Sequence, residues 1–191
     1  MLRSVGESVD GVIYKVSPDG TEKMVGYWDA SKNGFRNAGE KVEKFNSWDE
    51  MKTAHKGTVT KYLKENKPKG SPTPKKWFDK GGTIEIIEKN STTTWKYINA
   101  EGDAVNYVDG KVQFSQEQLF EDTNISNIDI KEFNGRSSDR SAVLKYIKKY
   151  GYDDIPEGYI VHHDYQNGKV QLVKEQIHIQ FTHYGGVYSN K

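Results

Sequence analysis

Histidines crowd the C-terminal part of the chain. Four of its five histidines are His162, His163, His178 and His183. Imidazole is the one side chain that titrates near neutral pH, and it also binds first-row metal ions well. The cluster therefore predicts a metal centre. The fifth histidine, His55, stands alone in a lysine-rich segment and is expected to be an ordinary structural or surface residue.

The residues around the cluster predict two strands followed by a helix. Residues 158–163 are apolar and β-branched, and residues 169–173 form a second such run. An Asn-Gly pair at residues 167–168 separates them, which is a strong hairpin signal. The pattern then becomes helical, with Ile177 and Phe181 four residues apart on one face.

This local structure constrains which histidines can bind one ion. His162 and His163 are neighbours on the first predicted strand, so their side chains point to opposite faces and we expect only one to reach the metal. His178 and His183 are five residues apart, which corresponds to about 500° of helix rotation. They can therefore share an ion only if the helix ends near Thr182.

Short motifs surround the histidines. They are Gly158-Tyr159, Val161-His162-His163, Val170-Gln171-Leu172-Val173, His178, His183 and Gly185-Gly186. In this order the motifs resemble the HNH/endonuclease VII-type nuclease domains of bacterial polymorphic and contact-dependent toxins. The most similar branch carries Trp-His-His, then Met-Gln-Leu-Val and His-x4-His-x-Gly-Gly.

Further motifs extend the resemblance upstream, so that it covers roughly residues 83–191. Those of the β-meander that opens such domains are Thr94–Asn99, Glu101–Asp103, Val105–Tyr107 and Val112–Phe114, and those before the central helix are Phe133–Arg136 and Asp139. Two positions depart from the family pattern, because Val161 replaces the Trp and Lys174 replaces a Pro that commonly begins the last helix. Neither change removes a group that does chemistry.

The resemblance implies a role for each clustered histidine. His162, His178 and His183 would hold one divalent metal ion, and His163 would be the general base that takes a proton from the attacking water. Hydrolysis of a phosphodiester needs a positive charge near the developing oxyanion and a base that works near neutral pH. The metal stays open among magnesium, manganese, nickel and zinc, because imidazole suits zinc and nickel by affinity whereas magnesium is far more abundant in cells.

Four cationic side chains complete the predicted site. Arg136, as a catalytic residue, and Arg140, as a nucleic-acid contact, flank a predicted helix over residues 139–150, where guanidinium groups can clamp a phosphate. Lys75 and Lys76 lie in a lysine-rich stretch whose charge suits a nucleic-acid backbone. The alternative for all four is an ordinary solvated position.

The composition along the sequence divides the chain into three parts. The predicted fold class is α+β. The Pro, Gly and Lys residues of segment 67–82 predict a basic linker. Residues 1–66 predict a small N-terminal α+β module, with strands over 12–16 and 23–28, that serves delivery or extends the nuclease. Residues 83–191 predict the nuclease domain, in which a β-meander precedes a ββα-metal motif.

The resemblance also implies partners and location. If the resemblance holds, the chain is the C-terminal part of a larger toxin that is secreted or delivered and acts in the cytoplasm of a competing cell. DNA is the first choice of substrate, and RNA also fits the motif. A cognate immunity protein with an acidic contact face is expected to protect the producing cell. The sequence contains no cysteine, so disulfides play no part, and no stretch is apolar enough to predict a membrane span.

Other function classes remain open from the residues themselves. One is a metal-independent or RNA-directed ribonuclease toxin, with His162 and His163 as an acid/base pair. Another is a non-catalytic nucleic-acid-binding module in which the histidines bind a structural zinc ion. A third is an inactive protein whose basic N-terminal region, within residues 1–80, binds nucleic acid.

Overall fold

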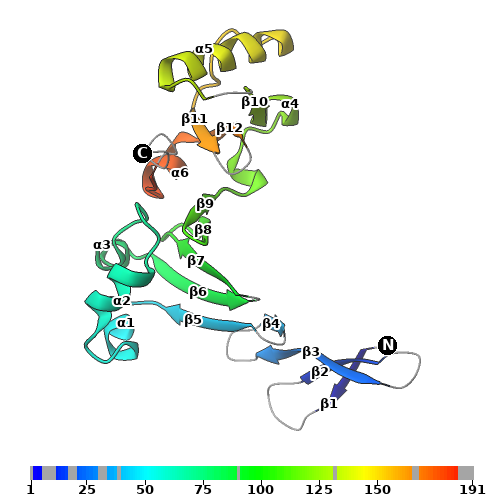
Figure 1. Cartoon of the computed structure of the whole chain (residues 1–191), viewed down its shortest axis with the longest axis vertical. Coiled ribbons are helices and arrows are strands. Elements are labelled where there is room, and N and C mark those ends of the chain that lie inside the picture. Colours follow the sequence, from blue (N-terminus) through cyan, green and yellow to red (C-terminus); the bar gives the residue numbers. More distant parts are fainter. Residues whose placement is uncertain are drawn as a thin grey trace. The chain divides into compact units, whose positions relative to one another are not determined.

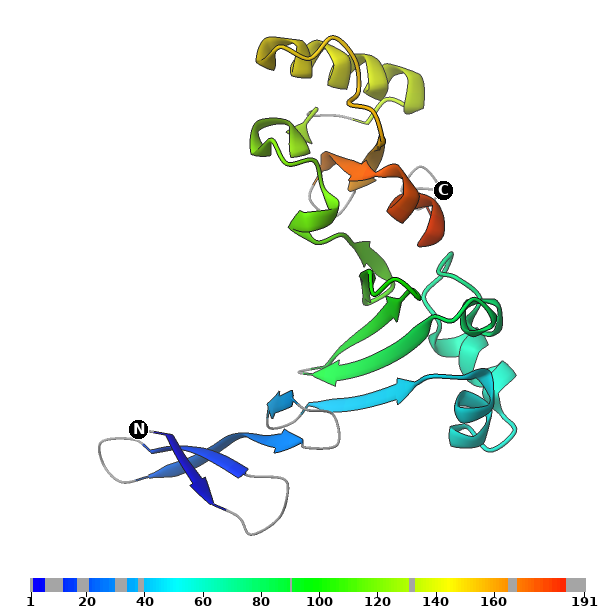
Figure 2. The same ribbon diagram turned by 180° about the vertical axis from the view of Figure 1, so that it is seen from behind.

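The computed structural model describes residues 2–5, 12–16, 21–29, 34–37, 40–89, 91–130, 133–164 and 168–184. The chain divides into two compact units. One comprises Met1–Glu43 with Ile86–Thr93, and the other comprises Lys44–Glu85 with Thr94–Lys191. Helices and sheets are mixed along the chain, as Figures 1 and 2 show from two sides, and the predicted α+β class is thus confirmed.

The first unit contains a four-stranded antiparallel sheet. Its strands follow one another in chain order and are β1 (Leu2–Val5), β2 (Val12–Val16), β3 (Glu22–Asp29) and β4 (Gly34–Asn37). The register shifts between Ile13 and Tyr14, where a bulge interrupts the ladder. Strands β2 and β3 match the two predicted strands, and residues 17–20 between them lie outside the described residues.

Three short helices begin the second unit. They are α1 (Trp48–Ala54), α2 (Val59–Asn66) and α3 (Pro74–Asp79). The hydroxyl of Ser47 caps α1 by accepting a hydrogen bond of 3.1 Å from the backbone N–H of Glu50. Pro74 opens α3, where its missing N–H costs nothing and its fixed φ suits the first turn.

A five-stranded sheet contains the predicted β-meander. Its strands lie in the order β5 (Lys41–Phe45), β6 (Thr83–Lys89), β7 (Thr92–Ile98), β8 (Ala104–Val108) and β9 (Lys111–Gln113). Alternate residues of β7 and β8 are fully buried, namely Trp95, Tyr97, Val105 and Tyr107. The period of two arises because successive strand side chains point to opposite faces.

Residues 67–82, for which the composition predicts a linker, are folded. They contain α3, and Trp77 at its centre is only 6% exposed. The indole Nε1–H of Trp77 donates to the carbonyl oxygens of Thr83 and Ile98, each at 3.1 Å. A Cβ at position 82 would collide with the Trp77 ring, so only glycine fits there. One large aromatic anchor thus outweighs the Pro, Gly and Lys composition of the segment.

The C-terminal part of the second unit holds the predicted strand pair and helix. Its elements are η2 (Gln116–Gln118), α4 (Thr123–Ser126), β10 (Asn127–Asp129), α5 (Arg136–Ile147), η3 (Lys148–Tyr150), β11 (Tyr159–Asp164), β12 (Lys169–Lys174) and α6 (Glu175–Gln180). The antiparallel sheet has the order β10-β12-β11. Of the predicted hairpin turn, residues 165–167 lie outside the described residues, as do Gly185 and Gly186.

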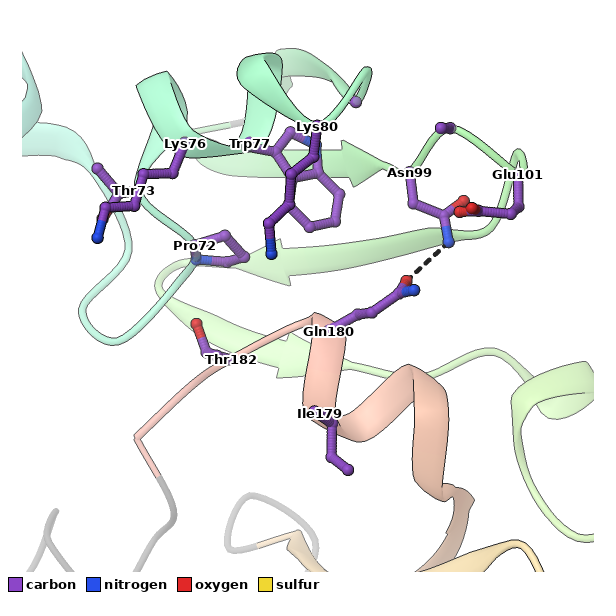
Figure 3. A pocket seen from close by; sticks show the side chains of 12 residues that line it. Pro72, Thr73, Lys76, Trp77, Lys80, Asn99, Glu101, Ile179, Gln180 and Thr182 are labelled. Atoms are coloured by element: carbon purple, nitrogen blue, oxygen red, sulfur yellow. Dashed lines mark hydrogen bonds between the residues drawn. The ribbon is translucent and has the colours of Figure 1, made fainter.

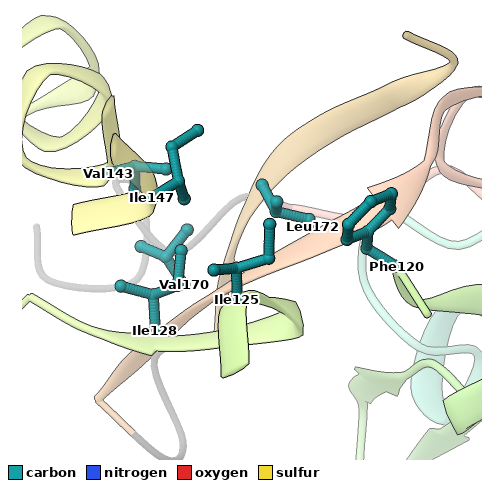
Figure 4. Packing of buried hydrophobic residues seen from close by; sticks show 7 residues of the cluster. All are labelled: Phe120, Ile125, Ile128, Val143, Ile147, Val170 and Leu172. Atoms are coloured by element: carbon teal, nitrogen blue, oxygen red, sulfur yellow. The ribbon is translucent and has the colours of Figure 1, made fainter. Parts of the chain in front are cut away.

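An apolar core joins α5 to one face of this sheet. Figure 4 shows its buried side chains, which come from α4, β10, α5, β12 and the segment before α4: Phe120, Ile125, Ile128, Val143, Ile147, Val170 and Leu172. Tyr159 and Val161 of β11 pack against the same cluster. Among the described residues, no helix has the length and apolar character needed to cross a bilayer.

Replacing Trp77 tests whether segment 67–82 is part of the folded unit. We expect Trp77→Ala to lower the free energy of unfolding by about 3–5 kcal/mol, because it opens a cavity and leaves two backbone acceptors without their donor. Chemical denaturation followed by circular dichroism measures this loss. Lys75→Ala is the matched control on the same helix, since it removes only an exposed pair with Asp79 that contributes at most about 1 kcal/mol. Equal midpoints for the two variants would show that the segment does not contribute to the core.

Candidate active site

Three histidines from separate elements come together in the second unit. His162 lies on β11, His178 on α6 and His183 just beyond α6. One ring nitrogen from each can be chosen so that all three lie within 4.8 Å of one another. The ring centroids are 4.8–5.4 Å apart, so the imidazoles surround a common point. These are the three residues that the sequence predicts as metal ligands.

The end of α6 brings His183 to this point. The helix stops at Gln180, and Phe181 leaves helical geometry with φ −94° and ψ 74°. The chain therefore turns back within a few residues, which the five-residue spacing from His178 requires. The Nδ1 of His183 then lies 2.9 Å from the carbonyl oxygen of Phe181. A carbonyl only accepts, so Nδ1 carries the hydrogen and Nε2 of the neutral ring has the lone pair that a metal needs.

The nitrogen spacing suits a metal ion. His183 Nε2 and His162 Nδ1 are 3.2 Å apart. Two nitrogens that each lie about 2.0–2.1 Å from a zinc ion are about 3.3 Å apart at the tetrahedral angle. His162 and His183 thus have the spacing of two ligands of one divalent cation, and His178 offers a third nitrogen within 4.8 Å.

Burial keeps these imidazoles neutral. Desolvation, reinforced by repulsion from the other histidines, lowers the pKa of His162 to about 2. Desolvation and repulsion from His183 lower the pKa of His178 to about 4. The pKa of His183 is also lowered by burial, although its bond to the Phe181 carbonyl opposes the shift. Near neutral pH all three rings therefore have the unprotonated nitrogen that metal binding requires.

The segment between His178 and His183 rests on the five-stranded sheet and α3. The hydroxyl of Tyr107 donates to the carbonyl oxygen of Thr182 at 2.8 Å, and the Asn99 side-chain amide donates to Gln180 Oε1 at 2.8 Å. The rings of Trp77 and Phe181 lie 5.0 Å apart. These contacts hold the end of α6 in place from the side of the meander.

Two further residues, Phe114 and Gly70, lie next to the histidine cluster. The Phe114 ring lies 5.0–6.1 Å from all three imidazoles, so it forms a wall of the site. Gly70, at φ +77°, approaches the backbone of His183 and Tyr184 so closely that a Cβ would collide with it. The loop before α3 therefore packs directly against a predicted metal ligand.

His163 points to the opposite face of β11 from His162. Its cross-strand partner is Val170, which belongs to the apolar core beneath α5. There, His163 Nε2 lies 2.9 Å from Oδ2 of Asp139, a residue of α5 that is 1% exposed. The other carboxylate oxygen accepts a 2.7 Å hydrogen bond from the backbone N–H of Asn134. A carboxylate accepts only, so Nε2 carries the hydrogen and Nδ1 of the neutral ring has the lone pair.

The predicted cationic residues lie at varied places in the second unit. Arg136 is exposed at the first position of α5, one turn before Asp139. The guanidinium of Arg140 donates to Asp154 Oδ1 at 2.8 Å. In α3, Lys75 pairs with Asp79 at 2.9 Å, whereas Lys76 lines a cavity between α3 and α6. Their roles in binding or catalysis stay predictions.

His55 lies apart from the cluster. It follows α1, and its ring stacks on that of Tyr62 with centroids 3.7 Å apart. This packing agrees with the structural position expected from the sequence.

Three contributions to the site have no clear signal in the sequence. Asp139 stands in a motif of the resembled family, but nothing local to it indicates a partner 24 residues away. From the sequence, Phe114 is expected to be a strand residue of the meander, and Gly70 is expected to belong to a linker. Each acquires its role only through contacts between distant segments.

Metal addition tests the histidine group independently of catalysis. We expect zinc, nickel or manganese to raise the melting temperature of the chelator-treated protein, because a ligand that binds only the folded state stabilises it by about 2.7 kcal/mol at a hundredfold excess over Kd. His178→Ala should lose this rise, whereas His163→Ala should keep it, since His163 bonds to Asp139 on the other face of the strand. Differential scanning fluorimetry with and without chelator measures both. A rise of the same size in His178→Ala would place the metal elsewhere.

Comparison with known proteins agrees with this geometry. Residues 151–191 match the family described as a nuclease of the HNH/ENDO VII superfamily with conserved WHH. In this chain Val161 precedes the histidine pair, and it packs against the core below α5. No curated protein and no solved structure matches the chain significantly. The matched segment contains all four clustered histidines, and over this segment the chain is similar to HNH-type endonucleases, which hydrolyse phosphodiester bonds.

Proposed function

We propose that this protein is a metal-dependent endonuclease toxin that cuts DNA in a competing bacterial cell. Strands β11 and β12 with α6 form its ββα-metal motif, and His163 is its general base. The observation that carries the proposal is the convergence of three neutral imidazoles beside a histidine that is bonded to a buried carboxylate. The family match over residues 151–191 supports the same reaction class.

His162, His178 and His183 would hold the divalent ion. When bound, the ion supplies positive charge to the phosphate oxygens as negative charge develops on them. Three neutral ligands leave the full charge of the cation available for this purpose. The carbonyl oxygen of Phe181 orients His183 by accepting its Nδ1–H, and Phe114 shields the three rings on one side.

His163 would take the proton from the attacking water at its Nδ1. Asp139 supports this step by accepting the Nε2–H, which sets the tautomer and orients the ring. The carboxylate also stabilises the imidazolium that forms when His163 accepts the proton. The bond from Asn134 holds the carboxylate in turn, and α5 carries it into the core.

DNA is the proposed substrate because the site needs only a phosphodiester and no base-specific pocket. Arg136 is proposed to contact the phosphate, and Arg140, Lys75 and Lys76 to contact the flanking backbone. The toxin role, delivery as the C-terminal part of a larger protein and action in the target-cell cytoplasm rest on the resemblance to toxin nuclease domains. A cognate immunity protein with an acidic contact face follows from the same role.

Replacing His163 tests the base. We expect wild-type protein with a divalent metal to nick supercoiled plasmid, and His163→Ala to lose about 10²–10⁴-fold in rate, because a general base contributes about that much. Gel assays with magnesium, manganese, nickel or zinc, on plasmid and on total RNA, measure the rate and the substrate. His55→Ala is the matched histidine control and should cut as wild type does.

The same assay separates the alternatives. Cleavage of RNA alone that survives chelator would indicate a metal-independent ribonuclease. Unfolding of the C-terminal part on chelation, without cleavage of either substrate in any metal, would contradict the nuclease and leave a structural zinc site.

Replacing Asp139 tests the tautomer argument. In Asp139→Asn the amide oxygen can still accept from the Asn134 N–H, but the amide NH2 then faces His163 Nε2. That nitrogen must become the acceptor, so the ring hydrogen moves to Nδ1 and the base is lost. We expect a rate loss on the order of 10²–10⁴-fold.

Two readouts separate this positioning role from a structural one. The metal-induced rise in melting temperature should persist in Asp139→Asn, and the remaining activity should lose the wild-type dependence on pH. Unchanged activity would show that Asp139 does not act through His163. Loss of both activity and the metal-induced rise would show that it only supports the fold.

A further inference from the structure

A cavity of about 460 Å³ lies between α3, the turn after β7 and the end of α6. Figure 3 shows Lys76, Trp77 and Lys80 on the α3 side, Asn99 and Glu101 on the turn, and Gln180 on α6. Its volume lies within the range of about 300–1,000 Å³ that small-molecule sites have. All lining residues belong to the second unit.

The charges on its wall favour an anion. Lys76 of α3 and Lys80, the residue that follows α3, both line the cavity. In the described part of the chain neither forms an ion pair, whereas their neighbour Lys75 is paired with Asp79 at 2.9 Å. Glu101 is the single acidic residue of the lining. Two ammonium groups without a carboxylate partner suit phosphate.

The remaining wall combines flat apolar surface with fixed polar groups. Pro72, Trp77 and Ile179 supply the apolar part. Asn99 and Gln180 are locked together by their 2.8 Å hydrogen bond, and the hydroxyls of Thr73 and Thr182 add donors and acceptors. A nucleotide presents the same combination, with a flat ring, polar ring edges and a phosphate.

The cavity is connected to the histidine cluster through one short segment. Ile179, Gln180 and Thr182 line it, and they lie between His178 and His183 in sequence. A ligand in the cavity therefore contacts the same stretch of chain that carries two of the proposed metal ligands.

We propose that this cavity binds a nucleotide of the substrate strand that flanks the cleavage position, with Lys76 and Lys80 on its phosphate groups. The proposal rests on the proposed function and names a binding subsite for its substrate. Lys76 thereby acquires a defined contact, while Lys75 is left outside it.

Binding without catalysis tests the subsite. The probe is a short fluorescein-labelled single-stranded DNA, and the protein carries His163→Ala in chelator, so that no cleavage occurs. We expect adding Lys76→Gln and Lys80→Gln together to weaken binding about tenfold and to reduce the slope of log K against log salt by about 1.4, since each phosphate contact on a single strand contributes about 0.7. Fluorescence anisotropy at several salt concentrations measures both quantities.

Two controls separate the cavity from general electrostatic attraction. Lys64→Gln with Lys69→Gln removes the same charge from exposed positions of the second unit outside the lining, and it should change binding less than about twofold. Ala100→Leu fills the cavity from an exposed turn position without changing charge, and it should weaken binding.

The outcomes distinguish the two proposals. Equal losses for the two lysine pairs, or unchanged binding in Ala100→Leu, would overturn the subsite while plasmid cleavage by the wild type still supports the nuclease. Cavity-dependent binding by a protein that cuts neither plasmid nor RNA in any metal would retain the subsite and overturn the nuclease.

Discussion

Three imidazoles packed side by side impose the main physical constraint on this structure. Two positive charges at such a distance would repel one another in a site with little water, so the rings are stable together only as neutral groups or around a cation. Burial enforces the neutral form by lowering the pKa of His162 and His178 to about 2 and about 4. The same burial gives each ring the lone pair that a metal requires. Desolvation of the rings thus keeps them in the neutral form that can bind a cation.

That burial depends on segments far apart in the chain. The end of α6 can return to β11 because Tyr107 and Asn99 bind its backbone and side chains, and because Trp77 packs on Phe181. Much of the second unit therefore serves to position two of the three rings. The folded segment 67–82 belongs to this support, since Gly70 lies against the backbone of His183. A nuclease motif of about forty residues on its own would lack these contacts.

The two histidines of the pair on β11 lie in different environments. His162 faces the other imidazoles, whereas His163 faces α5 and bonds to the buried carboxylate of Asp139. The alternation of a strand produces this division without any special backbone geometry. The proposed metal ligand and the proposed general base are thus adjacent in sequence and still have different partners, a neutral cluster for His162 and a carboxylate for His163.

The sequence by itself determined the strand pair, the helix after it and the identity of the clustered histidines, whereas the meander was expected only from the family resemblance. These features depend on periodicity, turn residues and residue type, which act over short distances along the chain. Only the tertiary structure decided that Asp139 pairs with His163 and that the Phe114 ring packs against the histidine rings. It also decided that residues 67–82 fold against the end of α6. Each of these depends on contacts between residues that are distant in sequence, and the composition of segment 67–82 indicated a linker instead. The physical reason is that packing around one buried ring, Trp77, contributes more to the free energy of folding than the local preferences of the neighbouring lysines and prolines.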